Sequence, residues 1–425
     1  MADERSNLRV TIVGINYAPE PTGIAPYTSG LAEGLAARGT NVYVITGFPH
    51  YPQWEVAAGY SGRTLEEEHA GVSILRLRHY VPRPPTSARR LLMELHFGLR
   101  ALFSAWESPD VVLFVSPALF ATRLLSLRAR LSGIPSCVWV QDIYSLGVAE
   151  TGGGDRAARL VGMVERGTLR AASRVVVIHD RFKRYLSSRL NVPADSIEVI
   201  RNWSHIDAEA LQRDDAMRER LGWGPDDVIV LHAGNMGAKQ GLLNVVRASQ
   251  LAEEQGSMVK FVLLGDGNAR EGLEAEGPNS HLQFIDPLPD GDFEAALASA
   301  DILVVNERPG LTEMSVPSKL TSYFATGLPV IGAVDDQSVT AEELRSAGAG
   351  PVVDPRRPLD LLRAAESLAA DPALAASYGS SAKAYRLSTL TADSAIGRFA
   401  TVLDGLASGA HSTTTEEYST AIGSA

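Results

Sequence analysis

The sequence is poor in cysteine, in long apolar runs and in the signatures of several common ligand sites. Cys137 is the single cysteine, which excludes an internal disulfide and a cysteine-based metal cage. No stretch approaches the roughly 18 uninterrupted apolar residues of a membrane-spanning helix. The opening segment MADERSN also lacks the apolar core of a signal peptide. We therefore expect a cytoplasmic protein without a membrane-spanning helix.

Signatures of three other ligands are missing or weak. The first apolar run, LRVTIVGI, is not followed by Gly-x-Gly-x-x-Gly, which argues against NAD. No long basic stripe with interleaved aromatic residues is present, so we expect no nucleic-acid partner. The residues from Asp290 to Asp292 read Asp-Gly-Asp, a metal-binding pattern in other proteins. Here they precede a helical pattern, where aspartates serve as caps and dipole partners, and we predict no metal site.

Charge is divided unevenly along the chain. The net charge is −11, yet residues 1–205 carry 23 Lys and Arg against 18 Asp and Glu, whereas residues 206–425 carry 16 against 32. Such a difference arises by chance over solvated surfaces, or it marks a basic face that meets an anionic ligand or membrane. Composition alone leaves both interpretations open.

Short apolar runs separated by helical patterns predict two parallel sheets. A chain of 425 residues suits two or three domains of about 150 residues each, and we expect two. The first half contains LRVTIVGI, NVYVITG, SILRL, VVLFVSP, SCVWVQD, RVVVIHD and IEVIRN. The second half contains VIVLHAGN, VKFVLLGDG, HLQFID, ADILVVNE, PVIGAV and GPVVDP. Apolar runs that alternate with helices are typical of doubly wound sheets, so the predicted fold class is α/β.

The domains are expected at residues 1–205 and 206–390. The polar segment from Ser204 to Asp227 has no strand pattern and is the predicted linker. The tail at 408–425 is rich in Ser and Thr and has few apolar residues, which predicts disorder.

The loop after the first predicted strand, INYAPEPTGIAPYTSGL, has the features of a ligand-binding connection. Pro19 and Pro21 forbid regular strand pairing, and a helical pattern begins just beyond Gly23. Free amides at a helix start attract anions, and Gly23 would let a ligand approach the backbone. An ordinary tight turn explains the loop equally well.

The same loop, taken with TGFPHYPQWEV, resembles the amino-terminal signature of colanic-acid-type glycosyltransferases of family 4. The resemblance continues through VQDIYSLGVAE, VIRNWSHID, HAGNMGAKQGLLNVVRA and SVPSKLTSYFATGLPVIGAVD, and so spans nearly the whole chain. It implies the GT-B fold, two facing Rossmann-like domains with an interdomain cleft. A sugar nucleotide would be held mainly by the second domain and an acceptor mainly by the first. A final helix at 391–407 would cross back onto the first domain.

The resemblance also implies a donor site built from glycine loops and helix starts. Lys239 lies beside a predicted helix start, where a diphosphate would meet the helix dipole and an ammonium group. Family members usually carry Arg and Lys at the positions of Asn235 and Gln240, so Lys239 and Lys319 would share that duty here. The expected donor-binding residues are Gly23, Gly234, Asn235, Lys239, Gly265, Gly267, Pro287, Leu288, Pro317, Ser318, Lys319 and Ser322.

One part of the expected donor site departs from the family pattern, and another does not identify the base. Many family members place two glutamates where this chain has Met314 and Ser322, which leaves recognition of the ribose open. Pro287 and Leu288 would offer backbone groups to the base edge without naming the base. The donor is therefore expected to be a UDP- or GDP-linked sugar, with no further cofactor.

Catalytic and acceptor-binding residues are expected at strand ends of the first half. Asp142, which ends SCVWVQD, is the first choice for a carboxylate facing the reacting sugar or acceptor hydroxyl, and His179 is the second. Each would serve equally well as a hydrogen-bonding residue behind the site. Tyr51, Gln53 and Trp54 would form an acceptor-side wall, with a local packing cluster as the alternative.

The expected reaction is a retaining, metal-independent sugar transfer to a saccharide or lipid-diphosphate acceptor. The segment 83–106 is amphipathic and basic, and Arg123, Arg128 and Arg130 extend that character. Peripheral contact with anionic lipid at the inner face of the plasma membrane would follow, although two ordinary surface helices explain the pattern too. A soluble small-molecule acceptor, and a sugar-nucleotide 2-epimerase of the same fold, remain alternatives.

Overall fold

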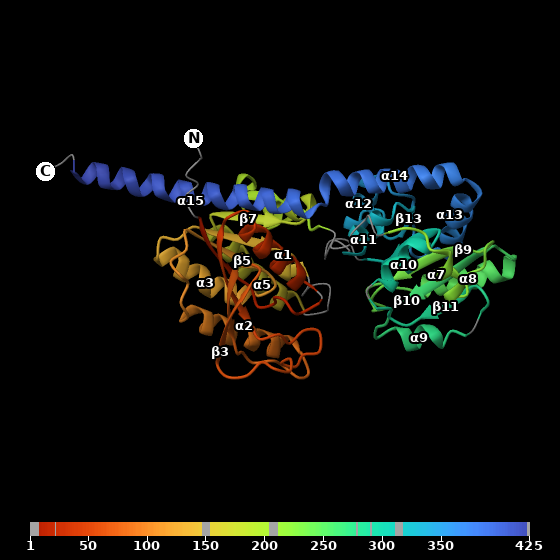
Figure 1. Ribbon diagram of the computed structural model, residues 1–425, viewed down its shortest axis with the longest axis horizontal. Helices are drawn as coiled ribbons and strands as arrows, with labels where there is room; N and C mark the ends of the chain where they lie inside the picture. The colour runs from red at the N-terminus through yellow and green to blue at the C-terminus, as the bar shows by residue number, and fades with distance from the viewer. Residues whose placement is uncertain are drawn as a thin grey trace. The chain divides into compact units, whose positions relative to one another are not determined.

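The computed structural model describes residues 8–21, 23–146, 154–203, 211–277, 279–289, 291–310 and 318–422. The chain forms two compact units (Figure 1). Unit 1 comprises Met1–Arg201 with Ala392–Ala425, and unit 2 comprises Asn202–Thr391.

Unit 1 is built on an eight-stranded sheet in the order β3-β4-β2-β1-β5-β6-β7-β8. The strands are β1 (Arg9–Val13), β2 (Asn41–Gly47), β3 (Thr64–His69), β4 (Val72–Leu77), β5 (Val111–Val115), β6 (Ser136–Val140), β7 (Arg174–Val177) and β8 (Ile197–Val199). Neighbouring strands are parallel except for the antiparallel β3–β4 hairpin. Strands β1, β5 and β6 are almost wholly buried, as expected for a sheet covered on both faces.

The helices of unit 1 are α1 (Ala25–Ala36), α2 (Ser87–Leu102), α3 (Leu119–Leu131), α5 (Gly154–Ala171), α6 (Asp180–Arg189) and α15 (Ala392–Ile422), with a short 3₁₀ turn η1 (Ala194–Ser196). The last helix, α15, packs along α1 (Figure 1). A Cβ atom on Gly34 would lie 2.4 Å from Cδ1 of Ile396, so the absent side chain lets these helices approach closely. Phe399 stacks edge-on against Trp139, with ring centroids 4.8 Å apart.

Unit 2 contains a six-stranded, fully parallel sheet in the order β11-β10-β9-β12-β13-β14. The strands are β9 (Val228–Ala233), β10 (Val259–Leu264), β11 (Leu282–Ile285), β12 (Ile302–Asn306), β13 (Val330–Ala333) and β14 (Val352–Val353). The helices are α7 (Asp215–Arg220), α8 (Leu243–Gln255), α9 (Arg270–Glu274), α10 (Asp292–Ser299), α11 (Ser318–Thr326), α12 (Val339–Ala347), α13 (Pro358–Ala370) and α14 (Pro372–Thr389).

Alternate residues of the unit 2 strands pack into two separate hydrophobic cores, one on each face of the sheet. Ile229 and Leu231 pack with α10, α11 and α12, whereas Val230 packs with α8 and α13 on the opposite face. Side chains of a strand alternate between faces, so an all-apolar strand needs helices on both sides. The doubly wound α/β fold predicted from the sequence is confirmed in both units.

Two segments differ from what the sequence predicts. Strand β3, with the sequence TLEEEH, was missed because its three glutamates hide a strand that pairs only with β4 at the edge of the sheet. Helix α15 continues to Ile422, whereas disorder was expected from residue 408. Extending a folded helix costs much less than nucleating one, and the tail contains no proline to end it.

Candidate functional site

The strand order of unit 2 reverses between β9 and β12. The chain moves outward from β9 through β10 to β11, then returns to the other side of β9 with β12. Ligands of open α/β sheets bind beyond the carboxyl ends of the strands at such a reversal. The loops that follow β9 and β12 are therefore the natural place for a nucleotide in this unit.

The loops after β9 and β10 are packed backbone against backbone. A Cβ atom on Gly265 would lie 2.2 Å from the carbonyl oxygen of Gly234, and one on Gly267 would lie 2.5 Å from that of Met236. The amide of Met236 also donates to the carbonyl of Asp266 at 2.8 Å. No residue with a Cβ fits at 265 or 267, so the glycines predicted from sequence are required for this close approach.

Lys319 of α11 reaches the β9 loop. Its Nζ atom donates to the carbonyl of Asn235 at 3.4 Å, and the ideal Cβ position of Gly234 lies 3.5 Å from the same Nζ. Burial lowers the pKa of Lys319 to about 8, and the negative charge of Glu307 opposes that shift. A half-buried ammonium over a glycine loop suits an anionic group such as a diphosphate.

Glu307 at the end of β12 is the carboxylate that acts on Lys319. Its Oε1 atom accepts a hydrogen bond of 2.6 Å from the Thr340 hydroxyl. Burial raises the pKa of Glu307 to about 7, with the nearby charge of Asp335 adding to the rise and Lys319 opposing it. His232, at 0% exposure, also faces the charge of Lys319, and burial lowers its pKa so that the ring stays neutral.

The other predicted donor residues are placed less distinctively. Lys239 is exposed and lies in a turn before α8, not beside its first helical turn, because α8 begins only at Leu243. Asn235 and Pro287 are exposed, Ser322 is half-buried, and Leu288 packs against one of the two cores. Pro317 and the Ser318 side chain lie outside the described residues. Their roles in donor binding stay predictions.

In unit 1, Glu20 joins the loop after β1 to the loop after β2. Its Oε1 atom accepts from the backbone amides of His50 at 2.8 Å and Tyr51 at 2.9 Å. Its Oε2 atom accepts from the Asn16 side chain at 2.8 Å. Gly23, in the left-handed region with a φ of 70°, lies beside the Tyr51 ring. The two predicted loops therefore form one structure at the carboxyl edge of the sheet.

Two of the three residues predicted for an acceptor wall lie together. The rings of Tyr51 and Trp54 pack edge to face, with centroids 5.8 Å apart, while Gln53 is exposed. Trp54 has a φ of 55°, a left-handed conformation that costs about 1–3 kcal/mol for a bulky residue. The guanidinium of Arg90 lies 4.6 Å from the Trp54 ring centroid. Strain of this kind is concentrated at functional sites, and the acceptor-binding role of Tyr51 and Trp54 stays a prediction.

Asp142 is exposed just beyond the carboxyl end of β6, on a segment held from behind by a buried glutamate. Glu165 of α5 accepts from the backbone amides of Tyr144 at 2.7 Å and Ser145 at 3.1 Å, and from the Ser145 hydroxyl at 2.6 Å. The Tyr144 hydroxyl donates to Glu94 at 3.0 Å. Asp142 thus lies on a fixed segment at the carboxyl edge of the sheet, the edge at which open α/β sheets bind ligands.

His179 is buried, with 1% of its surface exposed, at the start of α6. Its Nδ1 atom accepts the backbone amide of Arg181 at 3.1 Å, so the imidazole caps the helix. This contact gives His179 a structural role, and its catalytic role stays a prediction.

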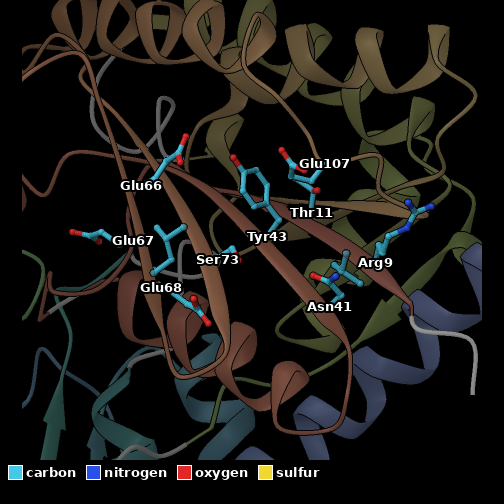
Figure 2. A pocket seen from close by; sticks show the side chains of 11 residues that line it. Arg9, Thr11, Asn41, Tyr43, Glu66, Glu67, Glu68, Ser73 and Glu107 are labelled. Carbon is cyan, nitrogen blue, oxygen red and sulfur yellow. The ribbon is translucent and has the colours of Figure 1, made fainter.

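A cavity of about 670 Å³ in unit 1 lies away from these loops (Figure 2). It is lined by the amino halves of β1 and β2, by β3 and β4, and by Glu107. Figure 2 shows the Tyr43 ring between Glu66 and Glu107; burial and these two carboxylates raise the pKa of Tyr43. An acidic lining repels a diphosphate, and no predicted site residue lines the cavity. It is therefore a poor candidate for the donor site.

The described ranges contain no group of three His, Cys, Asp or Glu side chains arranged to hold a metal ion. In the predicted Asp-Gly-Asp segment, Asp290 lies outside those ranges, and Asp292 starts α10 and pairs with Arg220 at 2.8 Å. Across the same ranges, no helix is long and apolar enough to cross a bilayer.

Four residues that support the candidate sites were not predicted from the sequence: Glu20, Glu165, Asn306 and Glu307. Each holds a residue distant in sequence, so its role depends on contacts that no local pattern reveals. A signal existed for Asn306 and Glu307, because polar residues that end an apolar strand lie at the ligand-binding edge of a parallel sheet.

Two family models match the chain in succession. The model described as "Glycosyl transferase 4-like domain" covers residues 22–203, and the one described as "Glycosyl transferases group 1" covers residues 213–385. Together with two doubly wound units, these matches make the protein a glycosyltransferase.

One relative identifies the family within the glycosyltransferases, and two solved structures identify the fold. The chain is 33% identical over 339 residues to the putative colanic acid biosynthesis glycosyl transferase WcaI of Escherichia coli K12, covering 75% of this chain and 82% of that protein. The chain belongs to glycosyltransferase family 4. Sucrose-phosphate synthase from Thermosynechococcus elongatus matches with a TM-score of 0.71 at 18% identity, over 95% of this chain and 100% of that chain. Anabaena HepE in complex with UDP gives 0.67 at 15% identity, over 94% and 100%. These structures confirm the GT-B fold.

Proposed function

We propose that the protein transfers a sugar, with retention of anomeric configuration, from a nucleoside-diphosphate sugar to a saccharide or lipid-linked acceptor. Unit 2 binds the donor and unit 1 supplies the acceptor-binding residues. The setting of Lys319 carries the donor assignment, because a half-buried ammonium lies over a glycine loop at the strand-order reversal of unit 2. HepE, a protein of the same fold, was solved with UDP and with UDP-glucose, which supports a UDP-linked donor.

The chemistry that this assignment requires is electrostatic. Positive charge and backbone donors stabilise a departing diphosphate, and a nearby carboxylate stabilises an oxocarbenium-like sugar. Lys319 would provide the first and Asp142 the second. The aromatic pair Tyr51 and Trp54 would bind the acceptor sugar ring through its apolar face.

Thermal shift with a panel of sugar nucleotides, followed by product analysis, tests the proposal. UDP- or GDP-sugars should raise the melting temperature, and one of them should give a glycosylated product that forms equally well with a metal chelator present. Conversion of the donor in the absence of any acceptor would indicate a 2-epimerase instead. Loss of transfer on chelation, restored by Mn²⁺ or Mg²⁺, would contradict metal independence.

We also propose that the acceptor is carried on an anionic membrane that unit 1 contacts through α2, α3 and α5. Helix α2 packs on α3, and α3 on α5. Large apolar side chains of these helices and of the residue after α2 remain exposed: Leu92, Leu95, Leu99, Phe103, Leu127, Leu131, Leu160 and Met163. Arg89, Arg123 and Arg130 are exposed on α2 and α3. Apolar side chains accompanied by arginines fit a bilayer with anionic headgroups.

Two residues of the predicted basic and apolar segment make contacts within unit 1 and do not belong to the exposed face. Trp106 is buried at 3% exposure, and its Nε1 atom donates to the carbonyl of Ala101 at 2.9 Å. Arg128 donates to the carbonyls of Leu102 at 2.6 Å and Ser104 at 2.9 Å, and lies over the Trp106 ring. These two residues close the end of α2 and are unavailable to lipid.

Replacing Leu99 and Phe103 by serine should reduce recovery with anionic vesicles in a flotation assay. Phe103 is 84% exposed and Leu99 49% exposed, so both can enter a bilayer, where each is worth roughly 1.5–3 kcal/mol when fully buried. Arg123→Glu with Arg130→Glu should have a similar effect at low salt, at about 1 kcal/mol for each arginine.

Met258→Ser in unit 2 provides a matched control, because Met258 is 65% exposed but lies outside this face. Its recovery should equal that of the wild type. A wild-type protein that ignores anionic vesicles while glycosylating a soluble acceptor efficiently would overturn the membrane proposal.

A further inference from the structure

The carboxamide of Asn306 ties the end of β12 to the loop that follows β9. Its Nδ2 atom donates to the carbonyl oxygens of Gln240 at 2.7 Å and Gly241 at 3.0 Å. Asn306 is 1% exposed. A single buried side chain therefore spans the strand-order reversal of unit 2 and holds the last residues of the loop.

A second buried carboxamide holds Asn306 in turn. Nδ2 of Asn244, in the first turn of α8, donates to Oδ1 of Asn306 at 2.8 Å. Oδ1 of Asn244 is buried and has no hydrogen-bond partner among the described residues. An unpaired buried oxygen lowers the stability of the fold. A gain in stability therefore does not explain why the Asn244–Asn306 pair is buried here.

The backbone beside Asn306 strengthens the same connection. The amide of Arg308 donates to the carbonyl of Lys239 at 2.8 Å. Gly241, with a φ of 58°, approaches so closely that a Cβ atom there would lie 2.9 Å from the Cα of Arg308. Three consecutive carbonyls, those of Lys239, Gln240 and Gly241, are thus fixed by the β12 end.

We propose that Asn306 is a positioning residue for the donor diphosphate, acting by fixing the carbonyls of Gln240 and Gly241. Turning these carbonyls toward β12 orients the peptide units of the loop, which keeps carbonyl oxygens from facing an anion. This role rests on the proposed donor site in unit 2. Asn306 itself does not touch the donor, and Asn244 supports it.

The inference predicts a selective loss in Asn306→Leu, which keeps the side-chain size and removes the donor hydrogens. Calorimetric affinity for UDP and GDP, whichever the wild type binds, should fall about tenfold, the size expected for one or two hydrogen bonds. Affinity for uridine or guanosine, which lack phosphates, should be unchanged. Asn306→Ser, which keeps one donor hydrogen, should show a smaller loss and serves also if the leucine variant does not fold.

Asn279→Leu is the matched control. Asn279 donates to the Ser249 hydroxyl at 3.0 Å and accepts from the amide of His281 at 3.0 Å, just before the amino end of β11. This variant should lose stability without losing diphosphate affinity. Equal losses for the diphosphate and the nucleoside in the Asn306 variants, or no loss, would overturn the positioning role while leaving the donor site intact. A wild type that binds neither diphosphate would overturn the donor site itself.

Discussion

Replacing Asp142 by asparagine should lower kcat by about 10²- to 10⁴-fold while changing donor affinity little. Asp142 is exposed beyond the end of β6, at the ligand-binding edge of the unit 1 sheet. Asparagine keeps the shape and removes the charge. A group that acts on developing positive charge, or on the acceptor proton, contributes in the transition state and so affects kcat more than binding. Steady-state kinetics with varied donor and a calorimetric donor affinity would measure the two effects.

Asp195→Asn is the control for charge removal, because Asp195 is an exposed carboxylate of the same unit at the turn before β8. Its kinetics should match those of the wild type. Glu165→Gln should give an intermediate result, since it keeps one acceptor for the amides of Tyr144 and Ser145 that fix the segment carrying Asp142. Near-normal turnover in Asp142→Asn, or equal losses of kcat and donor affinity, would leave Asp142 a structural residue.

The sequence was sufficient to predict the parallel sheets, because their strands are continuous apolar runs. Runs such as VVLFVSP and VKFVLLGDG contain strands with side chains buried on both faces, and short apolar runs bounded by turn residues are typical of such strands. Strand β3 was not predicted because it is not a continuous apolar run. It is an edge strand on which Glu66 and Glu68 are exposed. Its partner β4 fixes its position, and such pairing leaves no mark in the strand's own sequence.

The glycine loop that we propose for the donor could be located from the sequence, but its electrostatics could not. Gly234, Gly265 and Gly267 marked a backbone that needs close approach, and the structure has backbone contacts there. The shifted pKa values of Lys319 and Glu307 depend on burial between loops far apart in sequence. Burial of a particular charged group is a property of the assembled fold, so spacing alone could not indicate it.

The contact that fixes the predicted acceptor loop could not be predicted from the sequence either. Tyr51 and Trp54 were recognisable as aromatic residues near a strand end, and their edge-to-face packing is consistent with a wall for a sugar ring. Glu20, which fixes that loop through the amides of His50 and Tyr51, lies 30 and 31 residues earlier in the chain. Only the neighbouring positions of β1 and β2 in the sheet bring the carboxylate to those amides.

Replacing Lys319 by alanine should weaken binding of a nucleoside diphosphate by about 1–3 kcal/mol, roughly 5- to 150-fold, as for a lost charged hydrogen bond in a partly buried site. Lys319 lies over Gly234 and contacts the Asn235 carbonyl, so its ammonium is already at the loop before the ligand arrives. Lys239→Ala should weaken binding less, because Lys239 is exposed. Lys383→Ala, an exposed lysine of the same unit, should bind as the wild type does. Unchanged affinity in both the Lys319 and Lys239 variants would remove the proposed diphosphate site.

The pH dependence of this binding should separate Lys319 from its neighbours. Because the pKa of Lys319 is about 8 in the free protein, the ammonium is charged below that pH and its contribution is constant there. A bound diphosphate raises this pKa, so above pH 8 binding takes up a proton, and affinity falls by up to about tenfold per pH unit. Glu307, with a pKa of about 7, ionises at a lower pH than Lys319 loses its proton, and its negative charge then lowers the affinity by repelling the diphosphate. Buried His232 stays neutral throughout. Glu307→Gln should remove the decline that Glu307 itself causes and shift the Lys319 decline to lower pH, because the carboxylate no longer raises the pKa of Lys319. Lys319→Arg should remove the Lys319 decline, because arginine keeps its charge. A decline above pH 8 that persists in Lys319→Arg would assign the titration to another group.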